Sequence, residues 1–410
     1  MKQRDFPVYT VTPKAERALT AGHPWVYDAE ITHADDVENG ALVDVCSAKN
    51  RYLGTGFVSH ASKIRVRLLS RNASDTFDAA FWRRRIQYAW DYRKTVLAPA
   101  ELACCRIIFG EADFFPGLTV DRFGPLLSVQ VLSFGMERIK DMLFPLLVET
   151  LRADGQEITG LFERNDVALR TLEGLPQGKG WFDLSALSLP QPASPLAAIC
   201  ENGVKYTVDV ENGQKTGFFL DQKYNRQAVA RLAAGRTVLD CFTHTGSFAL
   251  NAALGGAAHV TAVDVSESAV AMARRNAEIN GVADRMDCVA ADVFDLLPAL
   301  AQHSDYAYDF IILDPPAFTK SRKTKQNALR GYKEINTRAM RLLPRGGYLA
   351  TCSCSHFADE AAFCAMLMES AHDAGVQLRQ IEARQQAPDH PILWGVDETS
   401  YLKFYLFQVV

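Results

Sequence analysis

The sequence lacks several features that would define its class at once. No apolar stretch in its 410 residues reaches the roughly 20 residues needed to cross a bilayer. No apolar segment typical of a secretory signal follows Met1. The nine cysteines form no CxxC pair of the zinc-binding kind, and their odd number favours reduced thiols. We therefore expect a cytoplasmic protein that has no membrane partner and no bound metal.

An excess of positive charge is also missing. The formal net charge is −4 and the pI is about 6.2, whereas a dedicated non-specific nucleic-acid binder is usually basic. Any contact with nucleic acid must therefore come from a local patch. The clearest candidate is the basic segment 320–333, which reads as either a nucleic-acid contact or a solvated loop. Its basic side chains are Lys320, Arg322, Lys323, Lys325, Arg330 and Lys333.

The first half of the chain predicts two small domains, because 410 residues exceed one ordinary core. Residues 1–72 carry alternating, β-branched strands punctuated by glycines, which indicates a small β-barrel. Residues 73–195 begin with an amphipathic helix over Phe77–Val96 and continue with strands and a helix, which indicates a central α+β domain. The proline-rich loops of residues 171–200 mark its end.

Residues 196–410 alternate strands with helices. This pattern predicts right-handed βαβ units and an α/β fold with a Rossmann-like parallel sheet covered by helices on both faces. The run Tyr401–Val409 has no helix after it and suits an antiparallel strand added to the sheet. The expected parallel strands are Thr237–Phe242, His259–Asp264, Asp287–Ala290, Phe310–Leu313 and Gly347–Cys352.

The ends of the first two strands carry residues suited to a nucleoside cofactor. Asp240 and Phe242 lead into Gly246, where a glycine lets the backbone approach a ligand closely. Only Gly246 is present, so the dinucleotide fingerprint GxGxxG is absent and an NAD site is disfavoured. The second strand ends at Asp264, followed by Ser266, and an acid there accepts hydrogen bonds from a ribose diol.

The third strand is followed by Asp292 and Val293. Asp292 is placed to hold an adenine amino group while Val293 packs against the ring. Each acid alone also suits a helix cap. Acids at three successive strand ends favour a site for S-adenosylmethionine (SAM).

Asp314-Pro315-Pro316 ends the fourth strand. Proline fixes φ and removes an amide donor, so the chain must leave the sheet with carbonyls turned toward the cleft. Those carbonyls and the Asp314 carboxylate are placed to accept protons from an exocyclic amine or a protonated ring nitrogen. A rigid turn is the alternative reading.

Two thiols, Cys352 and Cys354, lie where the fifth strand ends. Free cysteine is usually a buried apolar residue, but this segment is polar. A thiolate here is placed to attack C6 of a cytosine, which makes C5 nucleophilic toward a methyl group. A ring carbon needs this covalent activation, whereas an amine nitrogen does not.

Taken together, these motifs resemble those of the bacterial large-subunit ribosomal RNA cytosine-5 methyltransferases of the RlmI type. The resemblance covers nearly the whole chain. Its first part, similar to the family's RNA-binding PUA domain, central domain and hairpin, comprises Gly22–Tyr27, Tyr52–Phe57, Phe115–Gly124 and Gln214–Gln222. Its second part, similar to the cofactor, catalytic and C-terminal motifs, comprises Asp240–Phe248, Asp314–Phe318, Ser353–Ser355 and Ala387–Pro391.

The resemblance implies a PUA-like domain over 1–72 and a methyltransferase domain over 196–410. It implies that the chain forms 5-methylcytosine in 23S ribosomal RNA with SAM as cofactor. It identifies Cys354 as the nucleophile, with Asp314 beside it. The related enzymes often carry a second cysteine where this chain has Pro316, and Cys352 is a candidate to replace it in product release.

Two other functions stay open on the sequence. Asp-Pro-Pro before an aromatic also resembles the motif of enzymes that methylate the amino group of adenine or guanine, although the aromatic is displaced here to Phe318. A non-catalytic RNA-binding role would predict a degraded cofactor site. The sequence indicates no oligomeric state, although it allows a homodimer.

Overall fold

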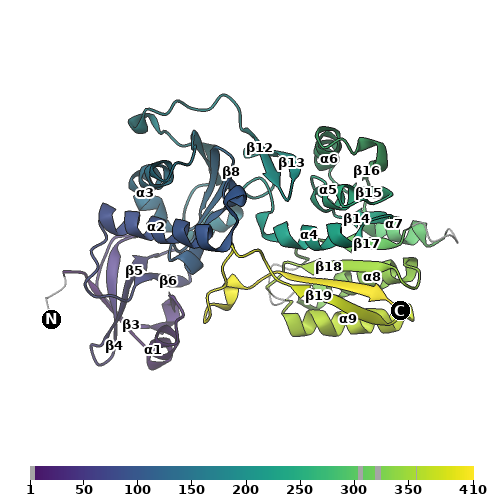
Figure 1. Ribbon diagram of the computed structural model, residues 1–410. Coiled ribbons are helices and arrows are strands. Elements are labelled where there is room, and N and C mark those ends of the chain that lie inside the picture. The colour runs from purple at the N-terminus through teal and green to yellow at the C-terminus, as the bar shows by residue number, and fades with distance from the viewer. Residues whose placement is uncertain (1–4, 303–307, 319–324, 357) are drawn as a thin grey trace. The chain divides into compact units, whose positions relative to one another are not determined.

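The computed structural model describes residues 5–302, 308–318, 325–356 and 358–410, and Figure 1 traces its elements. The chain divides into two compact units. Unit 1 comprises Met1–Ile199, Val208–Leu220 and Pro388–Thr399. Unit 2 comprises Cys200–Thr207, Asp221–Ala387 and Ser400–Val410. The predicted boundaries near residues 72 and 195 both lie in the first segment of unit 1, and they stay predictions.

The N-terminal part of unit 1 is a six-stranded sheet in the order β2-β6-β5-β4-β1-β3. β1 runs parallel to β4 and the other neighbours are antiparallel. Alternate residues such as Val43 and Val45 point into one apolar core, as the period of a strand requires. Its elements are β1 (Val8–Val11), α1 (Pro13–Thr20), β2 (Trp25–Tyr27), β3 (Ile31–Ala34), β4 (Leu42–Ser47), β5 (Tyr52–Val58) and β6 (Ile64–Ser70).

A second sheet of unit 1 has the order β11-β10-β9-β8-β7, and helices α2 and α3 contact each other beside it. α2 begins where the Asp78 carboxylate accepts a hydrogen bond from the Phe81 amide, an N-cap that satisfies one free backbone donor. The elements are α2 (Ala79–Val96), β7 (Cys104–Phe109), β8 (Leu118–Phe123), β9 (Leu126–Val131), α3 (Phe134–Ala153), β10 (Gly160–Asn165) and β11 (Gly178–Trp181). A separate pair, β12 (Leu196–Glu201) and β13 (Val204–Asp209), follows.

Unit 2 is built on a seven-stranded sheet in the order β16-β15-β14-β17-β18-β20-β19. The five strands from β14 to β18 run parallel, and β20 is antiparallel to both of its neighbours. The strands are β14 (Thr237–Cys241), β15 (His259–Asp264), β16 (Met286–Ala290), β17 (Phe310–Leu313), β18 (Tyr348–Ser353), β19 (Leu378–Arg384) and β20 (Lys403–Val409).

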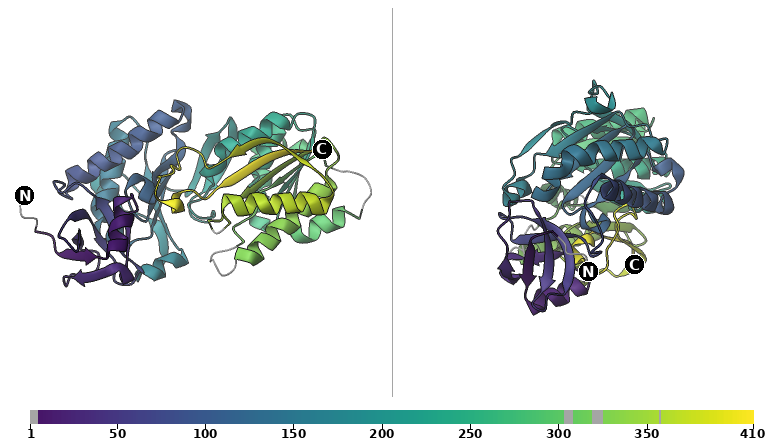
Figure 2. Two further views of the ribbon diagram at one scale, coloured as in Figure 1. Left: turned by 90° about the horizontal axis from the view of Figure 1, so that it is seen from below. Right: turned by 90° about the vertical axis from the view of Figure 1, so that its left-hand side faces the viewer.

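Helices cover both faces of this sheet (Figures 1 and 2). Leu239 and Leu313 share a core with residues of α7, α8 and α9 on one face. On the other face the ring of Phe248 in α5 stacks on Phe404, whose neighbour Tyr405 belongs to the first core. The helices are α4 (Lys223–Leu232), α5 (Ser247–Leu254), α6 (Glu267–Ile279), α7 (Val293–Leu300), α8 (Lys325–Leu342) and α9 (Glu360–Ala374).

The predicted fold class is confirmed, with a mixed α/β architecture and the expected Rossmann-like sheet. The sequence patterns did not reveal α1, α4, α7 and β19. α4 escaped because polar residues dominate its sequence, KYNRQAVARL, although several of its polar side chains are buried. Among the described residues, no helix has both the length and the apolar character needed to cross a membrane.

Candidate functional site

The parallel strands of unit 2 end at one edge of the sheet. The register places Cys241 opposite both Val263 and Leu313, and it places Leu313 opposite Thr351. Residues that follow these positions therefore gather at the carboxyl edge, where open α/β sheets bind ligands. All of the predicted site residues belong to this edge of unit 2.

Asp240 is fully buried at the end of β14. Its Oδ2 atom accepts hydrogen bonds from Thr243 Oγ1 at 2.5 Å and from the Ala249 amide at 2.9 Å. Its Oδ1 atom is buried and has no hydrogen-bond partner among the described residues. Burial raises the pKa of Asp240 to about 7, and the negative charges of Asp314 and Asp264 add to the rise. A carboxylate in this state can be stabilised by a positively charged ligand group.

The loop after β14 turns sharply. Phe242, His244 and Gly246 have φ values of 63°, 52° and 83°, in the left-handed region that non-glycine residues rarely adopt. The His244 amide donates to Asp264 Oδ2 at 2.9 Å, and the Ser266 amide donates to Asp264 Oδ1 at 2.9 Å. Asp264 thus fixes the loop from the neighbouring strand end. Each of its oxygens keeps a lone pair that can accept from a ribose hydroxyl.

The remaining predicted cofactor residues also have structural roles. Ser266 caps α6 by accepting from the Ala269 amide at 3.3 Å. Asp292 caps α7 by accepting from the Phe294 amide at 2.8 Å, and it is exposed. Val293 is buried in the core of the sheet. Among the three acids only Asp292 caps a helix, and its cap uses the Oδ1 atom, so the cap and a cofactor role are compatible.

Asp314 follows β17 and is held from two sides. Gln222 Nε2 donates to its Oδ1 atom at 3.0 Å, and the Cys352 thiol donates to the same carboxylate. Burial raises the pKa of Asp314 to about 6, helped by the charge of Asp221 and opposed by Arg226. Asp314 is therefore largely ionised at neutral pH and protonates in mildly acidic solution.

The two thiols at the end of β18 lie in different environments. Cys352 is completely buried, and its pKa is raised well above the ordinary value, first by burial and then by the charge of Asp314. Cys354 lies two residues further on and is partly exposed. Since the thiolate is the nucleophile, Cys352 is held in an unreactive form at neutral pH.

A buried lysine from β20 faces the same segment. Lys403 Nζ donates to the Ser355 carbonyl at 2.6 Å and to the Tyr401 carbonyl at 2.9 Å. Burial lowers the pKa of Lys403 to about 8, and the charges of Cys354, Asp359 and Glu360 oppose this shift. The interaction is reciprocal, so protonated Lys403 favours the thiolate form of Cys354.

The aromatic residue that follows the Asp-Pro-Pro segment is taken up by packing. The centroid of the Phe318 ring lies 4.7 Å from that of Tyr332, 5.8 Å from that of Phe294 and 6.4 Å from that of Phe242. An amino-methylating enzyme of the alternative class would use this aromatic to stack on the base. Phe318 is partly exposed, and its three ring contacts give it a packing role without a stacked base.

The predicted basic segment 320–333 lies only partly within the described residues. Lys320, Arg322 and Lys323 fall outside them, and Lys325 begins α8. Arg330 is exposed, whereas Lys333 pairs with two acids of α9, Glu369 at 3.2 Å and Asp373 at 2.9 Å. The charge of Lys333 is therefore largely compensated.

Sequence reasoning missed two side chains of this site, Gln222 and Lys403. Gln222 ends a motif of the family resemblance but has no role assigned from the sequence, and Lys403 lies in a run that predicts only an antiparallel strand added to the sheet. A lysine inside an otherwise apolar strand was the signal for the second. Within the described ranges, no group of three or more His, Cys, Asp or Glu side chains is placed to hold a metal ion.

The residues present fit SAM. Its amino and sulfonium groups are positive, which matches the uncompensated buried Oδ1 atom of Asp240. Its ribose diol matches the free lone pairs of Asp264. Its adenine would lie near the α7 end, where Asp292 is exposed.

Comparisons with known proteins agree with this geometry. Residues 190–408 match the family described as S-adenosylmethionine-dependent methyltransferase, and residues 10–71 match a PUA-like domain. Proteins named ribosomal RNA large subunit methyltransferase I are 36% identical in Salmonella paratyphi B, over 100% of both chains, and 35% identical in Klebsiella pneumoniae, over 99% of both. A structure from Streptococcus mutans, titled as a SAM-dependent methyltransferase, is 23% identical with a TM-score of 0.81 and covers 98% of this chain and 100% of its own. That likeness shows the fold.

Proposed function

The chain belongs to the family of SAM-dependent methyltransferases, and on that premise we propose that it methylates C5 of a cytosine in large-subunit ribosomal RNA. The substrate class follows the name of the relatives that match over the full chain. The observation that carries the choice of a ring carbon is the pair of thiols beside Asp314. Cys352 is buried and bonded to Asp314, whereas Cys354 is partly exposed.

SAM supplies the methyl group when it is bound. We assign Asp240, Phe242, Gly246, Asp264, Ser266, Asp292 and Val293 to its site. Asp264 receives the ribose hydroxyls and fixes the loop of Phe242 and Gly246 through the His244 amide. Asp240 would compensate the positive charge of the cofactor. Val293 would support the adenine from within the core, and Ser266 sets the start of α6.

The covalent steps fall to Cys354 and Asp314. The Cys354 thiolate attacks C6 of the cytosine and forms a carbon–sulfur bond, so that C5 becomes nucleophilic and takes the methyl group. A proton acceptor then removes the C5 proton, the C5–C6 double bond forms again and the sulfur leaves as the thiolate. Asp314 accepts a hydrogen bond from the exocyclic amine of the cytosine. Its bonds to Gln222 and Cys352 hold it in position.

Lys403 is a positioning residue in this proposal. It anchors the Ser355 carbonyl and so fixes the segment that carries Cys354. Its positive charge favours the thiolate, which a desolvated site would otherwise disfavour. Burying the charge of a lysine in a strand costs free energy. Stabilisation of the neighbouring thiolate gives a functional reason for that cost here.

We further propose that residues 1–72 form the RNA-binding PUA-like domain, 73–195 the central domain and 196–410 the catalytic domain. The matched spans 10–71 and 190–408 support the outer two limits. A substrate in the ribosome's large subunit implies work in the cytoplasm. A target base must leave its stack to reach the strand ends, so looped or single-stranded RNA is the favoured form.

Nucleoside mass spectrometry tests the proposal. Large-subunit ribosomal RNA from a strain that lacks the protein is incubated with purified enzyme and SAM, then digested. The expected product is 5-methylcytosine, absent with Cys354→Ala and unchanged with Cys200→Ala, a matched change of an exposed cysteine. A methylated amine of adenine or guanine would instead support the amino-methylating alternative. The absence of any methylated nucleoside would refute both functions.

A further inference from the structure

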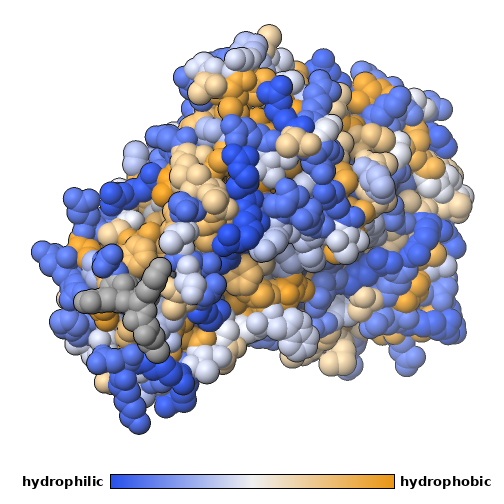
Figure 3. Space-filling view, turned by 60° about the vertical axis from the view of Figure 1, so that its left-hand side comes forward, coloured by the Kyte–Doolittle hydropathy of each residue, from blue (hydrophilic) through white to orange (hydrophobic). Residues whose placement is uncertain are grey.

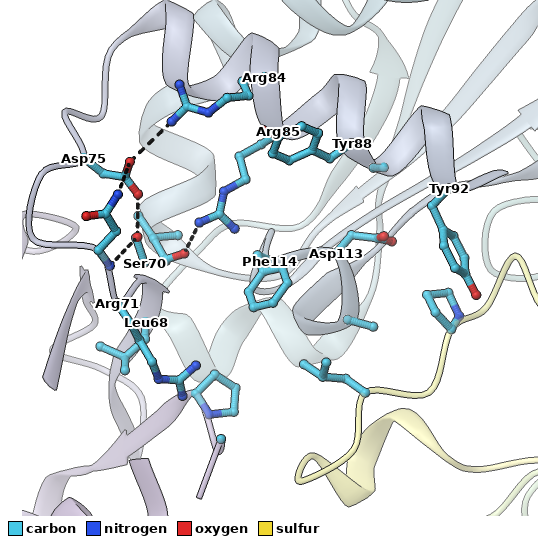
Figure 4. Close-up of a pocket in the computed structure, with 18 of the residues that line it drawn as sticks. Leu68, Ser70, Arg71, Asp75, Arg84, Arg85, Tyr88, Tyr92, Asp113 and Phe114 are labelled. Carbon is cyan, nitrogen blue, oxygen red and sulfur yellow. Dashed lines mark hydrogen bonds and ion pairs between the residues drawn. The ribbon is translucent and has the colours of Figure 1, made fainter. Parts of the chain in front are cut away.

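Unit 1 contains a cavity of about 860 Å³ that the proposed function has not used (Figure 4). It is lined by the end of β6, by one face of α2 and by the segments around Phe114 and Pro391. α2 and Phe114 lie beyond residues 10–71, the span that matches a PUA-like domain. The volume falls in the range of about 300–1,000 Å³ typical of pockets for small organic groups, and it suits a nucleotide in size.

Arginines give the cavity a positive charge that its own acids do not cancel. Asp75 pairs with Arg84 at 3.3 Å, and Asp113 pairs with Arg93 through two contacts of 2.5 and 2.7 Å. Both acids of the lining are therefore neutralised. Arg85 also lines the cavity and forms no ion pair among the described residues, so its positive charge adds to these two paired acids.

Arg71 and Arg85 are bonded only to backbone carbonyls among the described residues. Arg71 donates to the carbonyls of Leu19 at 3.2 Å and His23 at 3.1 Å, and Arg85 donates to that of Leu69 at 2.7 Å. Burial lowers the pKa of both guanidinium groups. Arg71 is exposed, whereas Arg85 is only partly exposed, and the nearby charge of Asp75 opposes only part of the effect of its burial. An anionic ligand would offset the remaining desolvation cost of the Arg85 charge.

Aromatic rings stand between these charges. Arg84, Tyr88 and Tyr92 are four residues apart on α2 and therefore share one face of the helix. Tyr88 is 61% exposed and Phe114 is 40% exposed. Arg85 lies over the Phe114 ring, 5.0 Å from its centroid, and Figure 4 shows the two side chains facing the same space.

Phe114 is presented by a strained turn. Its φ is 63°, in the left-handed region that is unusual for a bulky residue, and it ends the short helix Gly110–Asp113. Such conformations persist where the surrounding structure enforces them and are frequent at binding sites. Trp394, which is 92% exposed, directly follows Leu393 of the cavity wall. Apolar and hydrophilic groups are interspersed on the face shown in Figure 3.

We propose that this cavity binds a single-stranded or looped segment of the RNA substrate, with a base against Tyr88 and Phe114 and phosphates at Arg71 and Arg85. Exposed aromatics interleaved with arginines are the means by which proteins hold unpaired bases. A neutral peptide or metabolite would leave the two arginine charges uncompensated. The inference rests on the proposed function, since it names a second place where that RNA is bound, in addition to the strand-end site of unit 2.

Fluorescence anisotropy with a short, labelled single-stranded RNA of mixed sequence tests this binding site. Tyr88→Ala should weaken RNA binding about 5- to 100-fold, because it removes a stacking surface. Its matched control is Leu172→Ala, an equally exposed apolar side chain of unit 1 outside the cavity. Arg85→Gln should weaken binding and lower the salt slope by about one. Its control is Arg83→Gln on the same helix, where Arg83 pairs with Glu149 outside the cavity.

Two further readouts separate this inference from the proposed function. Calorimetry should give the same SAM affinity for all four variants, and thermal unfolding should show that Tyr88→Ala is folded. The wild type could methylate large-subunit RNA while Tyr88→Ala and Arg85→Gln bind RNA as well as their control variants do. That result would overturn the proposed RNA site in the cavity and leave the proposed function intact. If the wild type binds the RNA through these residues but methylates no RNA, the RNA site in the cavity would stand and the proposed function would fail.

Discussion

The Cys352 thiol donates a hydrogen bond to the Asp314 carboxylate and so links the ends of the adjacent parallel strands β18 and β17. The bond has opposite effects on its two members. It helps to keep Cys352 protonated, and it stabilises the ionised form of Asp314. In the proposed mechanism, Cys352 thus supports the carboxylate of Asp314, and the other thiol, Cys354, is the nucleophile.

Removing this bond should move the acidic limb of the pH profile. The pKa of Asp314 is about 6, so catalysis that needs its carboxylate falls as the pH drops through that value. Cys352→Ala removes a donor to the carboxylate and should raise the pKa of Asp314, which shifts the limb of log kcat/KM to higher pH. Cys352→Ser keeps a donor and should shift it less. If the acidic limb lies at the same pH in all three proteins, it does not report the titration of Asp314.

Cofactor binding should depend on Asp264. Asp264→Asn removes a charged acceptor, and hydrogen bonds to charged groups contribute about 1.5–3 kcal/mol. Calorimetry should therefore show SAM affinity lowered roughly 10- to 150-fold. Asp295→Asn, at an exposed acid of α7, is the control and should change little. An unchanged affinity in Asp264→Asn would remove this residue from the site.

Lys403 should set the alkaline side of the activity. Its pKa is lowered from 10.5 to about 8, so its positive charge is present below pH 8 and is lost above it. Lys403→Met should lower kcat about tenfold, corresponding to roughly 1.4 kcal/mol, while the SAM affinity stays the same. Lys403→Arg should retain the rate above pH 8, because arginine stays charged. Equal kcat in the methionine variant would leave Lys403 a purely structural residue.

Asp240 should make the protein's stability depend on pH. Its pKa is raised from 3.8 to about 7 in the folded state, so the folded protein binds a proton that the unfolded chain has lost. The stabilisation is complete below the unfolded pKa and disappears as the pH rises through 7, with a limiting slope of about 1.4 kcal/mol per pH unit. Asp240→Asn should flatten this dependence in urea unfolding experiments without SAM. A slope equal to that of the wild type would contradict the raised pKa.

The sequence patterns predicted the sheet of unit 2 well because the strand at its centre, β17, is uniformly apolar. Phe310–Leu313 is buried on both faces, and such a run has no other stable place than the middle of a covered sheet. α4 was missed because its polar side chains are buried in pairs, such as Arg226 with Glu201 at 2.6 Å. A partner that lies 25 positions away in the chain leaves no local signal in the sequence.

Site prediction followed the same division. The acids at the strand ends were visible because parallel strands bring their carboxyl ends to one edge. The difference between Cys352 and Cys354 was not visible, since it depends on burial and on the bond to Asp314. Lys403 reaches the site from the last strand, for which the pattern predicted an antiparallel addition to the sheet but no part in the site. The cavity beside Tyr88 combines residues from β6, α2 and the segment after His390, which no short motif could join.

The central claim is that Cys354 forms a covalent bond with the target base, and trapping with 5-fluorocytosine RNA tests it most directly. Fluorine replaces the proton that must leave C5, so the thioether cannot be released after methyl transfer. Denaturing electrophoresis should show a protein–RNA adduct in the wild type, none in Cys354→Ala, and an adduct in Cys352→Ala. If Cys352 aids release, that last variant should also accumulate adduct with unmodified RNA. An adduct that survives Cys354→Ala but disappears in Cys352→Ala, or full methylation by the double variant, would contradict this account.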